Sequence, residues 1–173
     1  MFYTNPIYGY IRTLLRFVLC KVQFIKEDVG KTIIMEDAKS FKIFRRVRIR
    51  RYFNKNKRPQ GLFIIRFALK MSIENIITSR GMLMIFMGFK GFRTKYWCVD
   101  EQSGMCQGLY EWDTLEDAVR YSKSVVIKRI TEHSVPGSVS YKILENSEEN
   151  CKWEIQDTPQ EEKLQFKMKY KIA

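Results

Sequence analysis

Cationic and aromatic side chains face one another across a predicted β-hairpin in the second half of the chain. The polar turn Asp100–Gly104 separates two alternating segments, 92–99 and 106–113, which predicts antiparallel strands. In the register that this turn sets, the residues on one face pair as Arg93 with Trp112, Lys95 with Tyr110, and Trp97 with Gly108. A cation over an aromatic ring contributes about 0.5–2 kcal/mol, so this face suits a planar anionic ligand such as an aromatic acid or a porphyrin carboxylate. The alternative is a cross-strand ladder that fills the sheet or a dimer seam.

Arg66 is a second candidate for ligand binding, because it interrupts the otherwise apolar segment 62–70. A buried arginine needs a carboxylate partner, and Glu111 and Glu145 are the candidates. An anionic substrate is the other interpretation. The ion pair is favoured because an unpaired buried charge is very costly.

Three further residues complete the candidate set. Met84 and Phe86 belong to the segment 82–89, whose flexible apolar side chains can line a pocket, form a subunit contact or cover the core. His133, the single histidine, ends a predicted helix. There it either ligates a haem or complements the helix dipole.

The composition excludes several classes of catalytic site. One histidine and four cysteines without a CxxC spacing provide neither a multi-histidine site nor a zinc site, so no metal is predicted. The sequence contains no Gly-rich phosphate loop and no nucleophile–base pair. Any enzymatic activity would therefore rest on an oxidisable substrate that reacts with oxygen, either directly or through haem, the one candidate cofactor.

The chain has 173 residues and a net charge of +12, nearly all of it in the first third. Residues 1–60 contain 15 Lys and Arg against 4 Asp and Glu, whereas residues 61–173 contain 16 against 15. This asymmetry indicates contact with an anionic phospholipid, nucleic acid or acidic protein, or a solvated basic surface. Without a recognition motif, specific nucleic-acid binding is not expected, and any binding would be salt-sensitive. The cations expected to contact an anionic surface are Arg12, Arg16, Arg45, Arg46, Arg48, Arg50 and Arg51.

The segment 6–24 has apolar residues at helical spacing and predicts a basic amphipathic helix. Its apolar sector contains Ile7, Ile11, Leu14, Leu15, Val18, Leu19 and Val22. This sector either lies in a membrane interface or docks on the domain or a second subunit, and docking is the commoner use of such a face. No run of eighteen apolar residues occurs, so no spanning helix is predicted. The cysteine usage and the lack of a secretory signal favour the cytoplasm, with peripheral membrane contact through this arm.

Segments 32–35 and 41–52 predict a hairpin around the polar turn 36–40, and residues 54–60 read as a linker. Alternation along the second strand gives it one apolar and one cationic side. The apolar side holds Phe41, Ile43, Val47 and Ile49, and the exposed cationic row holds Lys42, Arg46, Arg48 and Arg50.

Residues 61–146 predict two helices among four strands, in the order βαββαβ. The strands cover 62–70, 92–99, 106–113 and 138–144. One helix begins at Ser72, and the other runs from Thr114 to His133 with one face holding Leu115, Val119, Ser122 and Val126. This order is that of the ferredoxin-like plait, a four-stranded antiparallel sheet with both helices on one face.

The tail adds two alternating segments, 151–155 and 164–172, which predict a β-hairpin. The chain is thus expected to be an α+β protein with three parts. These are a basic helix and hairpin at 1–60, the plait at 61–146 and the C-terminal hairpin at 147–173.

Four stretches of the middle segment resemble the dimeric α+β-barrel superfamily: GFRTKYW (91–97), VDE (99–101), QGLYEWDT (107–114) and SVPGSVSY (134–141). The chain is most similar to the YdhR-like monooxygenases, relatives of the antibiotic-biosynthesis monooxygenases, over about residues 62–145, with residues 1–60 as an extra basic leader. The resemblance implies a homodimer whose two sheets pair into a barrel, and a small hydrophobic or aromatic ligand. The activities it implies range from haem degradation to cofactor-free oxygenation.

Overall fold

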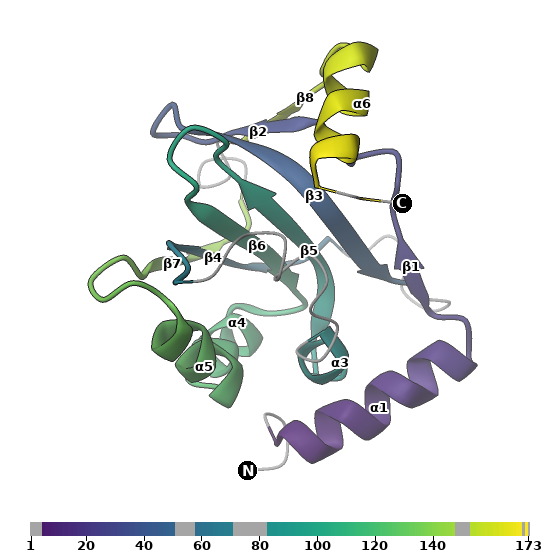
Figure 1. Cartoon of the computed structure of the whole chain (residues 1–173). Helices are drawn as coiled ribbons and strands as arrows, with labels where there is room; N and C mark the ends of the chain where they lie inside the picture. The colour runs from purple at the N-terminus through teal and green to yellow at the C-terminus, as the bar shows by residue number, and fades with distance from the viewer. Residues whose placement is uncertain (1–4, 51–57, 71–82, 148–152, 171, 173) are drawn as a thin grey trace.

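The computed structural model describes residues 5–50, 58–70, 83–147, 153–170 and 172. They form a mixed α+β structure in which an eight-stranded antiparallel sheet curls into a half-barrel (Figure 1). The strands are β1 (Val22–Phe24), β2 (Thr32–Ile34), β3 (Ser40–Ile49), β4 (Gly61–Phe67), β5 (Phe92–Val99), β6 (Cys106–Trp112), β7 (Ser140–Glu145) and β8 (Glu154–Gln156). The described helices are α1 (Pro6–Val18), α3 (Leu83–Phe86), α4 (Leu115–Ser122), α5 (Val125–His133) and α6 (Gln160–Lys169).

The four strands predicted for the middle segment are neighbours in one sheet. Their order is β7-β4-β6-β5, and every pair is antiparallel. β4 is an interior strand between β7 and β6 with side chains buried on both faces, as its apolar sequence indicates. The helix predicted to begin at Ser72 lies outside the described residues.

The sheet continues beyond β5 into the predicted N-terminal hairpin and then into the tail, in the order β3-β2-β8. β3 carries a bulge between Ile43 and Arg45. An extra residue reverses which side chains face which side. Phe41 and Ile43 therefore pack on one face of the sheet and Val47 and Ile49 on the other, so the single apolar side predicted for this strand is wrong.

The predicted C-terminal hairpin is also wrong, because its second segment is the helix α6. Alternating apolar residues suggested a strand. Pro159 instead precedes the helix as its N-cap residue, and Glu161 and Glu162 occupy the first turn, where their charges interact favourably with the helix dipole. β8 pairs instead with β2, with Ile155 opposite Ile33. α6 packs Phe166 against the outer side of β3 and β5.

Two of the predicted helices have different ends in the structure. α1 ends at Val18, because Cys20 takes a left-handed backbone conformation and Val22 begins β1. The helix predicted from Thr114 to His133 is divided into α4 and α5, with Ser124 extended between them. Of the face predicted from the sequence, Leu115 and Val119 are exposed and Val126 is buried. The buried residues of the two helices include Ala118, Tyr121, Val126, Ile127 and Ile130.

The start of α4 is capped by Thr114. Thr114 Oγ1 accepts the Asp117 amide at 3.1 Å and donates to the Asp117 carboxylate at 2.9 Å. Gly91 has a positive φ of 76° beneath this carboxylate, and a Cβ there would overlap it. This contact fixes the junction between β6 and α4 against the start of β5.

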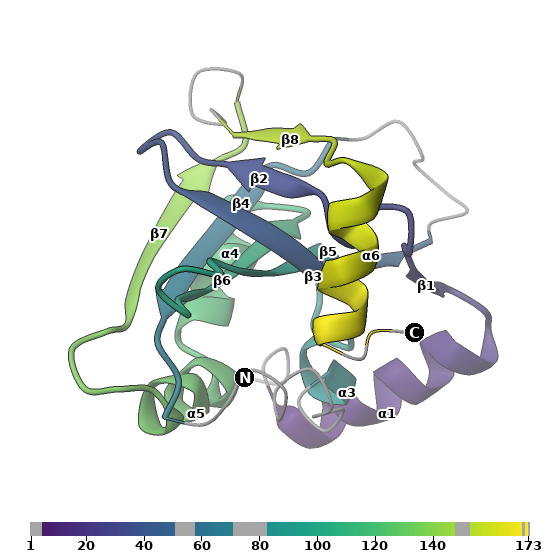
Figure 2. The ribbon, with the colours of Figure 1, turned by 45° about the horizontal axis from the view of Figure 1, so that its top comes forward.

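The two faces of the curled sheet are covered by different parts of the chain. Helices α1, α3, α4 and α5 lie on one side, whereas β2 and β8 curl over the other, concave side (Figure 2). The concave face buries Leu62, Ile64, Tyr96, Cys98 and Leu109 against Ile33, Met35, Phe41, Ile43 and, less deeply, Trp153 and Ile155. The chain's own segments thus cover much of this face within one copy.

Candidate functional site

Lys95 lies at the centre of the helix-covered face, where the predicted register is correct. It pairs with Tyr110, and Trp97 pairs with Gly108. Its Nζ lies 4.1 Å from the Trp97 ring centroid and 4.4 Å from those of Phe86 and Tyr110. The residue is only 5% exposed. Burial, assisted by the nearby positive charge of Arg45, holds the pKa of Lys95 well below its usual range.

The aromatic residues around Lys95 fill the space beside it with their own rings. Phe86 contacts the rings of Phe92, Trp97 and Tyr110 at centroid distances of 5.3 to 5.9 Å. Trp112 and Tyr110 each lie 4.8 Å from Tyr121. The pKa values of both tyrosines are raised by burial. The described part of this face is therefore a packed aromatic core.

Three other predicted ligand residues lie apart from one another. Arg93 does not face Trp112, because a bulge between Phe92 and Thr94 shifts the register, and its Nε pairs with the Asp113 carboxylate at 2.6 Å. Met84 is half-buried and packs against the aromatic core. His133 is exposed at the end of α5, where its Nδ1 donates to the Arg129 carbonyl oxygen at 2.8 Å.

Arg66 forms an ion pair, but with a carboxylate that the sequence did not single out. Its two terminal nitrogens bind the two oxygens of Asp37, with Nη2 to Oδ1 at 2.9 Å. Nε donates to Gln107 Oε1 at 2.8 Å, and the guanidinium lies 5.0 Å from the Phe41 ring centroid. The hydrogen bonds and charge of Arg66 outweigh partial burial and lower the pKa of Asp37 to about 2. Neither Glu111 nor Glu145 supplies the predicted counter-ion.

A cleft of about 380 Å³ opens beside this ion pair at the mouth of the half-barrel. Its apolar walls include Ile64 on β4, Leu144 on β7 and Trp153 before β8, and its polar residues include Arg66 and Asp37. A second hollow, of about 730 Å³, also has Arg66 in its lining. Arg66 is thus the one predicted ligand residue that lines both of these hollows.

α1 turns its small residues toward the body and its apolar residues toward solvent. Gly9 and Thr13 are buried, and Arg16 donates to the Met87 carbonyl oxygen. A Cβ on Gly88 would overlap the Gly9 carbonyl oxygen, so the two backbones touch directly. We define the apolar stripe, 42–79% exposed, as Ile7, Ile11, Leu14, Leu15 and Val18. The stripe is therefore not buried against the described part of the same chain, and docking on a second subunit, the other use that the sequence favours, stays a prediction.

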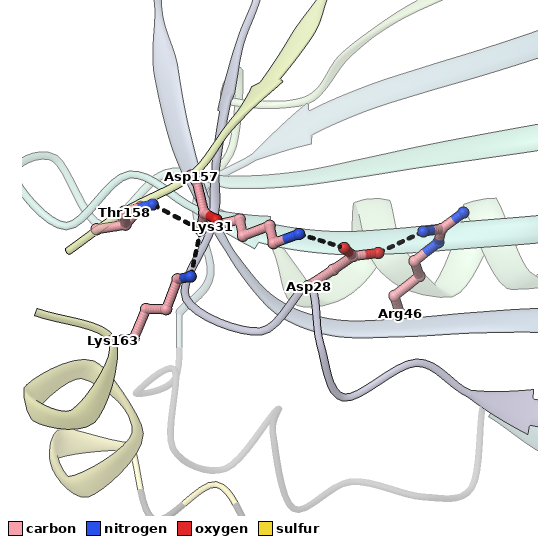
Figure 3. A network of polar contacts seen from close by, with 6 residues as sticks. All are labelled: Asp28, Lys31, Arg46, Asp157, Thr158 and Lys163. Carbon is pink, nitrogen blue, oxygen red and sulfur yellow. Dashed lines mark hydrogen bonds and ion pairs between the residues drawn. The ribbon is translucent and has the colours of Figure 1, made fainter. Parts of the chain in front are cut away.

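Two of the four members of the predicted cationic row on β3, Lys42 and Arg46, are paired with acids. Arg46 and Lys31 both bind Asp28, and a second part of the network joins Asp157 to Lys163 (Figure 3). Burial would raise the pKa of Asp28, but hydrogen bonds and charges from Arg46 and Lys31 lower it overall. Lys42, also in the row, binds Glu101 at 2.9 Å. Its neighbour Arg45 lies over the Trp97 ring. Arg48 and Arg50 are exposed.

Several residues of this arrangement carry no local signal in the sequence. Asp37 was part of a predicted turn and Trp153 part of a predicted hairpin, but only the curl of the sheet brings both to the cleft with Arg66.

Arg12 lies 6.0 Å from the Tyr8 ring centroid on α1, and Arg51 lies outside the described residues. Cys98 and Cys106 are buried, which raises the pKa of the Cys106 thiol to about 12.

No family model, curated protein or solved structure matches this chain. Among the described residues, no helix is both long and apolar enough to cross a bilayer. Within the same residues, no group of three or more His, Cys, Asp or Glu side chains is placed to hold a metal ion. Membership of the dimeric α+β-barrel superfamily stays a prediction from the sequence.

Proposed function

We propose that this protein docks on anionic membrane surfaces through α1. The observation that carries the proposal is the orientation of the helix: its small residues pack on the body, and the apolar stripe points away from it. A helix of this kind lies in the plane of the interface with its apolar side chains among the acyl chains. α1 lies at the edge of the molecule in both views, next to α3 and away from the curled sheet (Figures 1 and 2).

The charge around α1 complements an anionic lipid surface. Residues 1–26 contain no acid and carry Arg12, Arg16, Lys21 and Lys26. The backbone of Lys21 pairs with Arg50, so the exposed end of β3 adds to the cations at the end of the helix. Each Lys or Arg near an anionic membrane contributes about 1 kcal/mol, which is about fivefold in affinity.

Vesicle flotation with the full chain tests this proposal. We expect recovery with phosphatidylcholine vesicles that contain phosphatidylserine, weaker recovery without it, and loss of recovery at high salt. Ile11→Asp should reduce partitioning by about 10- to 100-fold, because the apolar burial of one such side chain contributes about 1.5–3 kcal/mol. Leu164→Asp is the matched control, since Leu164 is similarly exposed on α6. Deletion of residues 1–60 is unsuitable because it removes β3 from the middle of the sheet.

Equal recovery of Ile11→Asp and wild type would overturn the proposal. A second copy is the competing occupant of the stripe. Light scattering distinguishes it: a wild-type dimer that Ile11→Asp dissociates, without recovery of either form on anionic vesicles, would assign the stripe to self-association.

A second candidate function follows from the strand order. We propose that the strands β7-β4-β6-β5 belong to a ferredoxin-like plait and that copies of the chain form a homodimer, as the resemblance to YdhR-like monooxygenases implies. The antiparallel order of these four strands supports the plait. Light scattering tests the dimer, and turnover of quinols with oxygen tests a cofactor-free oxygenase. A monomer without turnover would contradict both.

A further inference from the structure

The cleft beside the Arg66–Asp37 ion pair combines apolar walls with a guanidinium group, that of Arg66, which neighbouring side chains hold in place. Ile64, Leu144 and Trp153 provide the walls, and the Arg66 side chain is 19% exposed at the edge of the cleft. A volume of about 380 Å³ lies within the range of small-molecule sites, which are mostly apolar with a few placed polar groups.

The guanidinium of Arg66 is held by contacts other than Asp37. Gln107 is buried and accepts the Nε hydrogen bond, and the Phe41 ring lies beneath the group. Replacing the anion on Nη1 and Nη2 would therefore leave the arginine in place. Such a two-donor fork matches the geometry of a carboxylate.

Asp37 is the less firmly held partner of this pair. It belongs to the turn between β2 and β3, and its side chain is 44% exposed. A partly exposed ion pair contributes little because water competes for both groups. Exchange of one carboxylate for another also leaves the charge on Arg66 compensated.

We propose that this cleft binds a small aromatic carboxylic acid, whose carboxylate takes the place of Asp37 on Arg66. The aromatic body would lie against Ile64, Leu144 and Trp153, and Asp37 would move out into solvent with its turn. The site lies on the concave face, opposite the helix-covered face to which the sequence assigned a ligand. It is independent of α1 and of membrane docking.

The experiment measures binding of 2-naphthoate and of its uncharged analogue 2-naphthamide to the full chain by isothermal titration calorimetry. We expect naphthoate to bind at least tenfold more tightly than the amide. Arg66→Gln should remove that difference. Asp37→Asn should raise naphthoate affinity about fivefold, because the competing carboxylate is gone.

Two controls separate the exchange from general attraction of anions and from loss of fold. Lys142 also lines the cleft, and Lys142→Gln should change naphthoate affinity by less than about twofold. Thermal unfolding of each variant checks that the sheet is intact, and Asp37→Ser provides a second removal of the carboxylate.

The outcomes divide clearly. If the ligand replaces Asp37 on Arg66, removal of Asp37 should raise the affinity for naphthoate. If the ion pair has only a structural role, no such gain is expected. Absence of naphthoate binding, equal binding of acid and amide, or an Asp37 variant that binds no better than wild type would each overturn the proposal.

Discussion

Lys95 and Arg66 are cations on strands of the same sheet, and both lie over aromatic rings, but they face opposite sides. Lys95 is enclosed among Phe86, Trp97 and Tyr110, and the structure places no carboxylate on it within the described residues. Arg66 lies at the edge of a cleft and is paired with Asp37.

The comparison shows that a cation beside aromatic rings is not by itself an anion site. Where the rings close around the amine and exclude water, the charge is disfavoured and the pKa falls, so the group becomes part of the core. Where the cation has a fork of donors and an edge open to water, its anion can be exchanged. Of the two residues, Arg66 alone combines a fork of donors with an edge open to a cleft, which is what exchange of an anion requires.

The largest effect that sharpens this comparison is expected from Phe86→Ala. Phe86 is 1% exposed and its ring contacts Phe92, Trp97 and Tyr110 over Lys95. Removal of a buried aromatic ring typically destabilises a domain by about 3–5 kcal/mol. Urea unfolding would measure this loss. Trp153→Ala, at a half-buried wall of the cleft, should cost about half as much, and equal losses would contradict the contrast between a filled face and an open one.

The next effect is expected from Lys95→Met, which keeps the side-chain volume and removes the amine. Because burial lowers the pKa of Lys95, the folded protein holds fewer protons than the unfolded chain between that lowered pKa and 10.5. Wild-type stability should therefore rise with pH across this window. At pH 7 the variant should be more stable by about 1–3 kcal/mol, the cost of a buried polar group without a partner.

Urea unfolding at several pH values would measure the difference, which should narrow as the pH rises towards 10.5. Lys128→Met is the control, because Lys128 is exposed on α5. A Lys95→Met variant that is less stable at every pH would show that attraction between a charged amine and the three rings dominates.

Features of the fold that depend on residues close together in the sequence were predicted correctly. Features that depend on contacts between distant segments were not. The turn at 100–104 was enough to pair Lys95 with Tyr110 and Trp97 with Gly108. The bulges after Phe92 and Ile43 have no such signal, and each changes which side chains share a face. The counter-ion of Arg66 comes from a turn 29 residues earlier, brought there by the curl of the sheet.

The two terminal helices show the same limit. The period of α1 is clear in the sequence, but its orientation depends on the contact of Gly9 with Gly88, which no periodicity reveals. In α6 the alternation of Leu164, Phe166 and Met168 resembled a strand. The acidic first turn and basic last turn favoured the helix that the structure has.

The smallest effect is expected from Asp37→Asn, which removes the exchangeable anion. A pair in which one side chain is 44% exposed should contribute less than about 1 kcal/mol at pH 7. Because Arg66 lowers the pKa of Asp37 from 3.8 to about 2, this contribution is fully present above the unfolded pKa and is lost as the pH falls through about 2. Wild type and variant should therefore converge in stability at the acid end of a urea titration series.

Glu36→Gln is the control for this measurement, because it removes one negative charge from the same turn without touching the ion pair with Arg66. A loss of several kcal/mol in Asp37→Asn, or a difference that persists below pH 2, would mean that the carboxylate is a fixed part of the fold. Arg66 would then resemble Lys95, a cation whose surroundings leave no room for another anion. A small loss of stability that disappears in acid would instead mean that another carboxylate can replace Asp37 on Arg66. Arg66 would stay in position because Gln107 and Phe41 also hold it.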